Sequence, residues 1–245
     1  MASLQKLDTV LAEVKEASLQ MSLPPPTGVY DSLDENVLLM GSVVNLAGIM
    51  VSEAFDWQAL RKPLVFVGDG AKTAFDLPAD FSRFVDETGW SSAIHRPVNV
   101  LNAQQWASVR SWLSQSFYIN PACRIMADQL QFLSPPAAGD QISFEYVDAN
   151  WVIDADAVPT LYKQKANKNA DKPRFDWLLM VLAIKVKFLE QKGMSTVAEQ
   201  SDFNDRLMQL TQRDQMAQVL TLSGPVPGGF RYIGGGNTPD TGFGL

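Results

Sequence analysis

The sequence predicts an α+β protein: an α-helical bundle with an inserted small antiparallel β-sheet domain and an extended C-terminal arm. Two stretches, Phe75–Trp90 and Phe132–Trp151, alternate apolar and polar residues beside a proline-bearing corner, which is the period of a strand with one buried face. Segments with helical periodicity lie on both sides of them, and the last residues are rich in Gly and Pro. The predicted parts are 1–60 for the first helices, 61–160 for the β-rich insert, 161–222 for the closing helices and 223–245 for the arm.

Two helices are expected in the N-terminal part. Residues 3–20 form an apolar stripe at helical spacing, which favours an amphipathic helix. A second helix is predicted to begin at Ser32, because Ser32 and Glu35 have the spacing of a capping box, and to continue toward Trp57 or Leu60.

The middle of the second predicted helix, VLLMGSVVNLAGIMV, is apolar on nearly every side. We therefore expect it to be packed on several sides, by its own chain or by a neighbouring subunit. Gly41 and Gly48, seven residues apart within it, fit either close contact with another helix or an ordinary central helix.

In the β-rich part, LVFV, Gly68-Asp69-Gly70 and KTAFDL favour a hairpin that leads into a corner at Pro78. The stretches Phe75–Trp90 and Phe132–Trp151 are predicted to be edges of one small sheet. In the second stretch, alternation places Ile142, Phe144 and Tyr146 on one face and Ser143, Glu145 and Val147 on the other.

Cap signals predict three further helices. Asn102 and Gln105 have the spacing of a reciprocal cap before a helix that carries Trp106. A long helix is predicted from about Pro173 to Lys192, where Gly193 ends it. The last helix follows a capping box formed by Thr196 and Glu199, with its predicted apolar stripe at Phe203, Leu207, Leu210 and Ala217.

Between these parts, residues 160–174 are polar and basic, and four of their lysines are candidates for contact with a partner: Lys163, Lys165, Lys168 and Lys172. A loop of this length suggests a function. It is either a solvated surface loop or a contact with an acidic partner surface or a DNA backbone.

Composition narrows the class of protein. The formal net charge of −7 over 245 residues argues against a general nucleic-acid-binding protein, whose footprint would be basic, but not against one that DNA passes without sticking. The single cysteine, Cys123, rules out an internal disulfide and a Cys-based zinc site. Charges interrupt the apolar residues of the N-terminus, so we expect neither a signal peptide nor a membrane span there, and we expect no later run to be long and apolar enough to cross a bilayer.

We expect no enzyme, no cofactor and no metal site. The only histidine is His95, and no G-x-S-x-G elbow accompanies it. Gly68 and Gly70 lack the third glycine and the Lys-Ser/Thr pair of a phosphate-binding loop. Asp154 and Asp156, on one face of a strand, could bind a cation or serve glycoside hydrolysis, but acidic pairs are common in an acidic chain.

Several pieces of the chain carry a family resemblance. They are FDWQALRKPLVFVG, FDLPADFSRFVDETGW, RPVNVLNAQQWASV, CRIMADQLQFLSPPAAGDQISFEYVDANWV and a helix ending in KFLEQKGM. In this order, over roughly residues 50–215, they resemble the bacteriophage head-to-tail adaptors, also called head-tail connectors or tail accessory factors.

The resemblance implies a structural virion protein that forms a homo-oligomeric ring, usually dodecameric, beneath the portal protein. Such a ring joins the portal to a tail or nozzle protein and lines the channel through which DNA is ejected. It implies a location at the head-tail junction of the virion, and in the host cytoplasm during assembly. A tail-tube or terminator component and a tail-associated cell-wall hydrolase are the alternatives.

Adaptors of this family dock extended C-terminal segments on the portal. In residues 223–245 the candidate anchors are Phe230, Arg231, Tyr232 and Phe243. Because lysines and arginines in the lumen would hold the passing DNA, we expect the net acidity to line the channel and the four lysines of the basic segment to lie at a protein contact.

Overall fold

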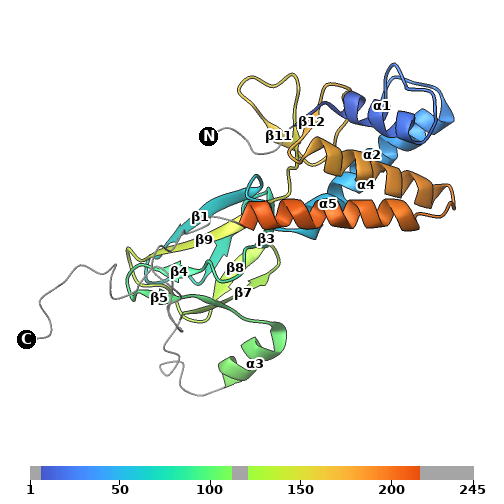
Figure 1. The fold of residues 1–245 in the computed structure, drawn as a ribbon. Coiled ribbons are helices and arrows are strands. Elements are labelled where there is room, and N and C mark those ends of the chain that lie inside the picture. Colours follow the sequence, from blue (N-terminus) through green and yellow to red (C-terminus); the bar gives the residue numbers. More distant parts are fainter. Residues whose placement is uncertain (1–6, 112–120, 216–245) are drawn as a thin grey trace, which may run out of the picture.

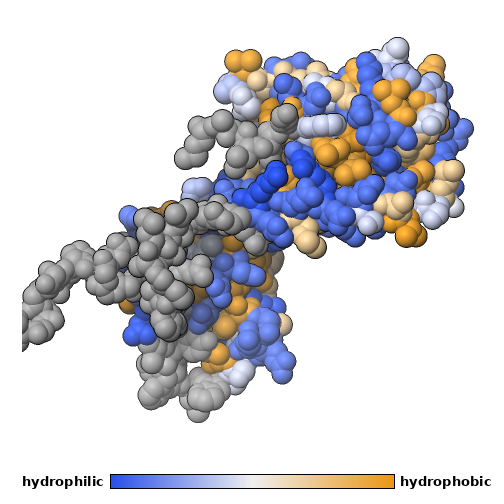
Figure 2. Space-filling view, viewed as in Figure 1, coloured by the Kyte–Doolittle hydropathy of each residue, from blue (hydrophilic) through white to orange (hydrophobic). Residues whose placement is uncertain are grey.

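The computed structural model describes residues 7–111 and 121–215. It confirms a mixed α+β fold, with four of the five described helices gathered at one end of the molecule, and the helix 103–111 and most strands at the other (Figure 1). The space-filling view of the same face shows apolar residues interrupting the polar surface of the helical end (Figure 2). A large apolar core fills the helical end, and a smaller one lies within the sheets.

The helical end contains α1 (Val10–Gln20), α2 (Glu35–Ala54), α4 (Trp177–Gln191) and α5 (Val197–Gln215). Helix α4 is its centre, because it packs against each of the other three. It is buried over most of its length, and the side chain of Asp176 caps its first turn by accepting from the N–H of Leu179.

The predicted N-cap of α2 is wrong. Asp34, not Ser32, is the N-cap residue, and its Oδ1 accepts from the N–H of Asn36 at 2.8 Å. Ser32 instead accepts a hydrogen bond from the N–H of Asp34. A carboxylate suits this position because it also meets the positive end of the helix dipole.

The two glycines of α2 make close contacts, but not with another helix. A Cβ on Gly48 would lie 2.2 Å from the ring of Trp151, and one on Gly41 would lie 3.4 Å from Val29 and 3.5 Å from Tyr30. Trp151, which follows the longest strand, stacks on Phe175 with ring centroids 6.2 Å apart. The glycine at position 48 therefore lets a strand-end tryptophan enter the helical core.

Helix α2 is also long and apolar enough to cross a membrane, by length and composition alone. Core helices of soluble proteins pass the same test, and α2 packs against α4 with one side buried.

The strands form three sheets. The first has the order β1 (Arg61–Val67), β9 (Gln141–Asp148), β4 (Trp90–Ser91) and β5 (Arg96–Pro97), with β3 (Phe81–Phe84) also on β9. The second has the order β2 (Ala74–Asp76), β8 (Gln129–Phe132), β7 (Ala122–Met126) and β6 (Asn99–Val100). The third joins β11 (Tyr162–Lys163), β10 (Val152–Ile153) and β12 (Lys172–Pro173).

This topology overturns two expectations. The predicted hairpin does not form, because β1 pairs with β9 and β2 pairs with β8. Gly68 lies against the turn at 136–140 instead, where a Cβ would meet the carbonyl oxygen of Ala137 at 2.3 Å. The two alternating stretches are not edges of one sheet either, since β9 is central and β2 and β8 belong to the second sheet.

Other local expectations are confirmed. In β9, Ile142, Phe144 and Tyr146 are buried on one face; Val147, on the other face, is buried too because it joins the helical core. Helix α3 (Ala103–Ser111) has the predicted reciprocal cap: Gln105 N–H donates to Asn102 Oδ1 at 2.8 Å, and Asn102 N–H donates to Gln105 Oε1 at 3.0 Å.

A carboxyl group lies inside the helical core. Glu13 on α1 is 1% exposed, and neither of its oxygens has a hydrogen-bond partner among the described residues. Burial raises the pKa of Glu13 well above its usual value, and the carboxylates of Asp8 and Asp176 raise it further. The protonated form is therefore the one that suits the folded state.

We expect Glu13→Met to stabilise the fold at pH 8 by about 1–3 kcal/mol, because it removes an unpartnered buried polar group. The folded state holds the proton more tightly than the unfolded chain. The wild-type protein should therefore gain stability as pH falls through the raised pKa of Glu13 toward 4.5, and the difference should shrink. Urea unfolding at pH 8 and pH 5 measures this, with Glu16→Met on the same helix as the control. A destabilised Glu13→Met protein at pH 8 would contradict the assignment.

Candidate functional site

The basic segment 160–174 is folded back onto its own chain. Its ends form β11 and β12, which pair with β10 in the third sheet. Its backbone also meets the start of α1, because the N–H of Val10 donates to the carbonyl of Asp171 at 2.8 Å. The segment is thus a structural connection between the first helix and the strands, and not a free loop.

Asp171 organises the segment from inside. Its side chain is fully buried, and Oδ2 accepts from Lys163 Nζ at 2.7 Å and from the N–H groups of Asn167 and Lys168 at 2.9 Å each. Burial alone would raise the pKa of Asp171, but the hydrogen bonds from Lys163 and from the backbone lower it below its usual value. The carboxylate is therefore ionised and fixes the turn around it.

Two of the four predicted contact lysines are paired within the chain. Lys163 binds Asp171, and the ammonium of Lys168 lies 2.9 Å from both Asp154 and Asp156. Hydrogen bonds to Asp156 and Asp154 raise the pKa of Lys168 above its usual value. The acidic pair considered for cation binding or glycoside hydrolysis thus faces a lysine.

Lys165 and Lys172 are exposed, and within the described ranges neither side chain has a hydrogen-bond or ion-pair partner. They are the two lysines of the segment that can offer an unpaired charge to a partner. The prediction that the segment contacts a protein partner rests on them.

Two asparagines that the sequence reasoning missed also hold the segment. Asn45 on α2 bonds the backbone of Ala166 twice, accepting from its N–H at 2.8 Å and donating to its carbonyl at 3.1 Å. Asn169 accepts from the N–H of Val29 at 2.8 Å and donates to Asp31 at 2.9 Å. Each asparagine bonds to a residue more than 100 positions away, so no pattern of neighbouring residues in the sequence indicates these contacts.

Next to the segment, Asp148 at the end of β9 joins the helices to the first sheet. This fully buried carboxylate accepts from Lys62 Nζ at 2.8 Å and from Arg174 Nη1 at 3.0 Å. Arg174 also donates to the carbonyls of Ala59 and Asn150, and its guanidinium lies 4.2 Å from the ring centre of Tyr162. We call Lys62, Asp80, Asp148 and Arg174 the charged junction.

Asp80 extends the charged junction across the sheet. It forms an ion pair with Lys62 and accepts from the hydroxyl of Tyr146 at 3.0 Å. Burial raises the pKa of Tyr146 to about 12, together with its hydrogen bond to Asp80. Burial would also raise the pKa of Asp80, but the hydrogen bonds from Lys62 and Tyr146 lower it.

The charged junction gathers residues from stretches that are far apart in the sequence. Asp80 lies in LPADF, Tyr146 and Asp148 lie in FEYVDANW, and Lys62 lies in FDWQALRKP. Beside the junction, Arg83 pairs with Asp56 at 2.7 Å. These stretches therefore supply residues that fix the sheet to the helices.

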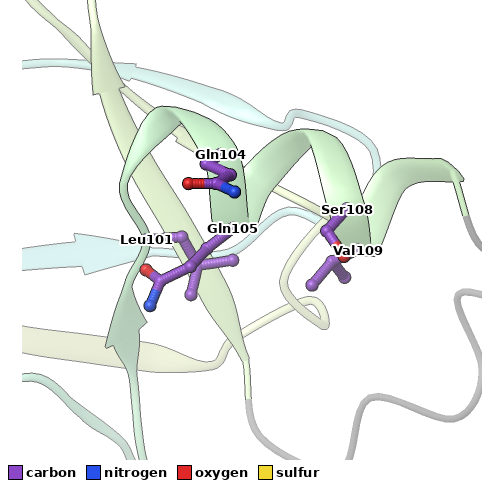
Figure 3. A pocket seen from close by; sticks show the side chains of 5 residues that line it. All are labelled: Leu101, Gln104, Gln105, Ser108 and Val109. Atoms are coloured by element: carbon purple, nitrogen blue, oxygen red, sulfur yellow. The ribbon is translucent and has the colours of Figure 1, made fainter.

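The other candidates show no comparable arrangement. A surface pocket of about 330 Å³ beside α3 is lined by Leu101, Gln104, Gln105, Ser108 and Val109, none of which is charged (Figure 3). His95 is exposed on a turn with a positive φ of 49°. Cys123 is buried, and burial raises the pKa of its thiol to about 12. No group of three or more His, Cys, Asp or Glu side chains suited to a metal ion occurs in the described ranges.

The predicted anchors of the C-terminal arm, Phe230, Arg231, Tyr232 and Phe243, lie outside the described residues. Their docking on a portal stays a prediction.

We expect Asp171→Asn to destabilise the fold by about 3 kcal/mol, because it removes the buried charge that holds Lys163 at 2.7 Å and leaves that lysine only the longer ion pair with Asp154 at 3.7 Å. Asp156→Asn is the control: its side chain is 74% exposed, so the loss should stay below about 0.5 kcal/mol. Because the folded-state pKa of Asp171 is lowered from 3.8, its charge stabilises the fold above that pH, and the effect is lost as pH falls through the folded-state value. Equal effects of the two substitutions in urea unfolding at pH 7 would refute the role given to Asp171.

Comparison with known proteins adds no family to this description. No protein-family model matches the chain, and no curated protein matches it.

Proposed function

We propose that this protein is a bacteriophage head-to-tail adaptor, a structural virion protein that forms a ring between the portal and the tail and lines the DNA channel. In this proposal the packed helices form a bundle, the β-rich residues 61–160 are an insert in it, and residues 223–245 are the arm that docks on the portal. The family resemblance suggests this function. One structural observation, an exposed apolar stripe on α2, gives it the most support.

The stripe consists of Leu38, Leu46 and Ile49, which are 52%, 43% and 41% exposed. With Ser42 between them, they follow one side of α2 at spacings of three and four residues, while Met40, Val44, Ala47 and Val51 are buried on the opposite side. Three large apolar side chains exposed along one side of a helix, interrupted only by Ser42, are consistent with a contact with another protein surface. A neighbouring subunit in a ring would cover it.

The surface charge of α5 fits a wall that DNA passes. Asp202 and Asp205 are exposed one turn apart, whereas Arg206 is directed inward and lies 2.8 Å from Asp176. Arg213, in the last turn, is exposed as well and places one positive charge at that end of the helix. A duplex carries about one negative charge per 1.7 Å of its axis, so an acidic wall would not retain it. We therefore assign the outward side of α5 to the channel.

The double substitution Leu46→Asp with Ile49→Asp tests the ring interface. Because both side chains are exposed in the subunit, we expect the thermal transition to shift by only a few degrees, as for other surface changes. The charges should nevertheless prevent assembly, because they would be buried against an apolar neighbour without partners. Light-scattering mass of the purified protein, alone and with purified portal, measures the loss.

The matched control is Leu19→Asp with Met194→Asp, two exposed apolar residues outside the stripe, at 57% and 60% exposure. This variant should assemble on the portal like the wild-type protein. If the stripe variant also assembles normally, α2 is not the interface. If the wild-type protein binds purified tail-tube protein but not portal, the tail-tube or terminator function replaces the adaptor.

A further inference from the structure

The first sheet ends in an open edge. Strand β1 is bonded to β9 on one side and lies last in the sheet order. At the two ends of this ladder, Asp148 N–H donates to Leu60 C=O at 2.9 Å and Gly68 N–H donates to Asp140 C=O at 2.8 Å. In an antiparallel pair the bonded residues alternate, so Lys62, Leu64 and Phe66 direct their backbone groups to β9.

The odd-numbered residues of β1 therefore direct their backbone groups away from the sheet. Pro63 has no N–H and occupies one of these outward positions, where a proline is tolerated. Val65 and Val67 each leave one N–H and one C=O at the edge, and no residue in the described ranges bonds to them from that side. These groups can pair with an added strand.

The side chains at this edge are apolar as well. Val65 and Val67 are 53% and 58% exposed. Across the same face, Val65 is opposite Ser143 of β9, and Ser143 is opposite Trp90 of β4, which is 46% exposed. A strand added to β1 would extend this face and cover part of its apolar surface.

The described chain ends beside this edge. Asp214, in the last turn of α5, accepts from the N–H of Gln58, and its carbonyl accepts from the side chain of Gln58. Gln58 lies just before β1, and Figure 1 shows the end of α5 next to β1 and β9. The remaining residues 216–245 therefore start at one end of the open strand.

Residues 216–245 are long enough to reach along the open edge of β1, and they contain a stretch that favours a strand. Between Gln215 and Phe230 lie residues 216–229, which can span roughly 45–50 Å at full extension, against about 23 Å for β1. The stretch Phe230-Arg231-Tyr232-Ile233 contains three residues that favour strands and lies between two glycines before it and three after it. Between Pro227 and Pro239 there is no proline, so each residue carries an N–H.

We propose that the β1 edge is the docking site for residues 230–233 of the same chain, which add a strand to the first sheet in the free subunit. Backbone hydrogen bonds to Val65 and Val67 supply the pairing, and alternate side chains of the added strand cover the exposed valines. The added strand also blocks an edge that would otherwise pair with other molecules. This proposal concerns the free subunit and does not depend on the adaptor function.

Amide hydrogen exchange of the full-length protein, followed residue by residue by NMR without portal, tests it. The variant Arg231→Pro with Tyr232→Pro removes one N–H donor from each of the two alternating sets of the docking stretch, so a donor that faces β1 is lost in either register. We expect the amides of Val65 and Val67 to exchange about tenfold faster in this variant than in the wild-type protein, since only paired amides are protected. The amides of Leu64 and Phe66, which bond to β9, should not change and report an intact sheet.

The control variant carries Asn237→Pro and Thr241→Pro, outside the docking stretch, and should keep the wild-type protection. Three results would overturn the proposal. The first is that the Val65 and Val67 amides are unprotected in the wild-type protein, and the second is that they are equally protected in the wild-type protein and in the docking variant. Protection that increases with protein concentration would assign the edge to a second copy instead.

Discussion

The burial of Asp148 is the constraint on which the rest of the structure depends. A carboxylate without access to water needs opposite charge and hydrogen bonds, and Lys62 and Arg174 supply both. Lys62 belongs to the sheet, whereas Arg174 lies three residues before α4, the helix that the other three of the helical end contact. The same guanidinium satisfies the carbonyls of Ala59 and Asn150, so it also fixes the chain at the entry to β1 and the exit from β9. Trp151 stacks on Phe175 and packs against Gly48, so apolar contacts also join the first sheet to the helices.

Internal pairing of cations also shapes the surface. Several positive groups contact carboxylates of their own chain: Lys62, Arg83, Lys163, Lys168, Arg174 and Arg206. A segment that looks basic in the sequence is therefore much less basic as a surface, because Asp154, Asp156 and Asp171 neutralise Lys163 and Lys168. Exposed acidic residues such as Asp202 and Asp205 therefore contribute a larger share of the electrostatic potential around the protein. Under the proposed adaptor function, this charge distribution would limit the retention of passing DNA.

Local signals predicted local structure well, and long-range pairing poorly. The cap formed by Asn102 and Gln105 and the alternation along β9 depend on neighbours in the chain, and both were correct. The hairpin after Pro63 was wrong because strand partners are chosen by the whole sheet: β9 pairs with β1, while Gly68 is occupied by the turn at 136–140. The predicted N-cap of α2, Ser32, was wrong because Asp34 occupies the position directly before the first helical residue. The roles of Asn45, Asn169 and Asp171 could not be predicted, because each depends on contacts made across distant parts of the chain.

The central claim is that this chain is one subunit of a ring at the head-tail junction. Cryo-electron microscopy of the purified protein bound to portal tests it most directly, because the density would show copy number, the position of α2 and the course of residues 223–245 in one map. The account predicts a closed ring on the portal exit, with the α2 stripe between neighbouring subunits, the acidic side of α5 toward the channel and the arm on the portal. A single bound copy, or a ring in which Leu38, Leu46 and Ile49 face solvent, would contradict it.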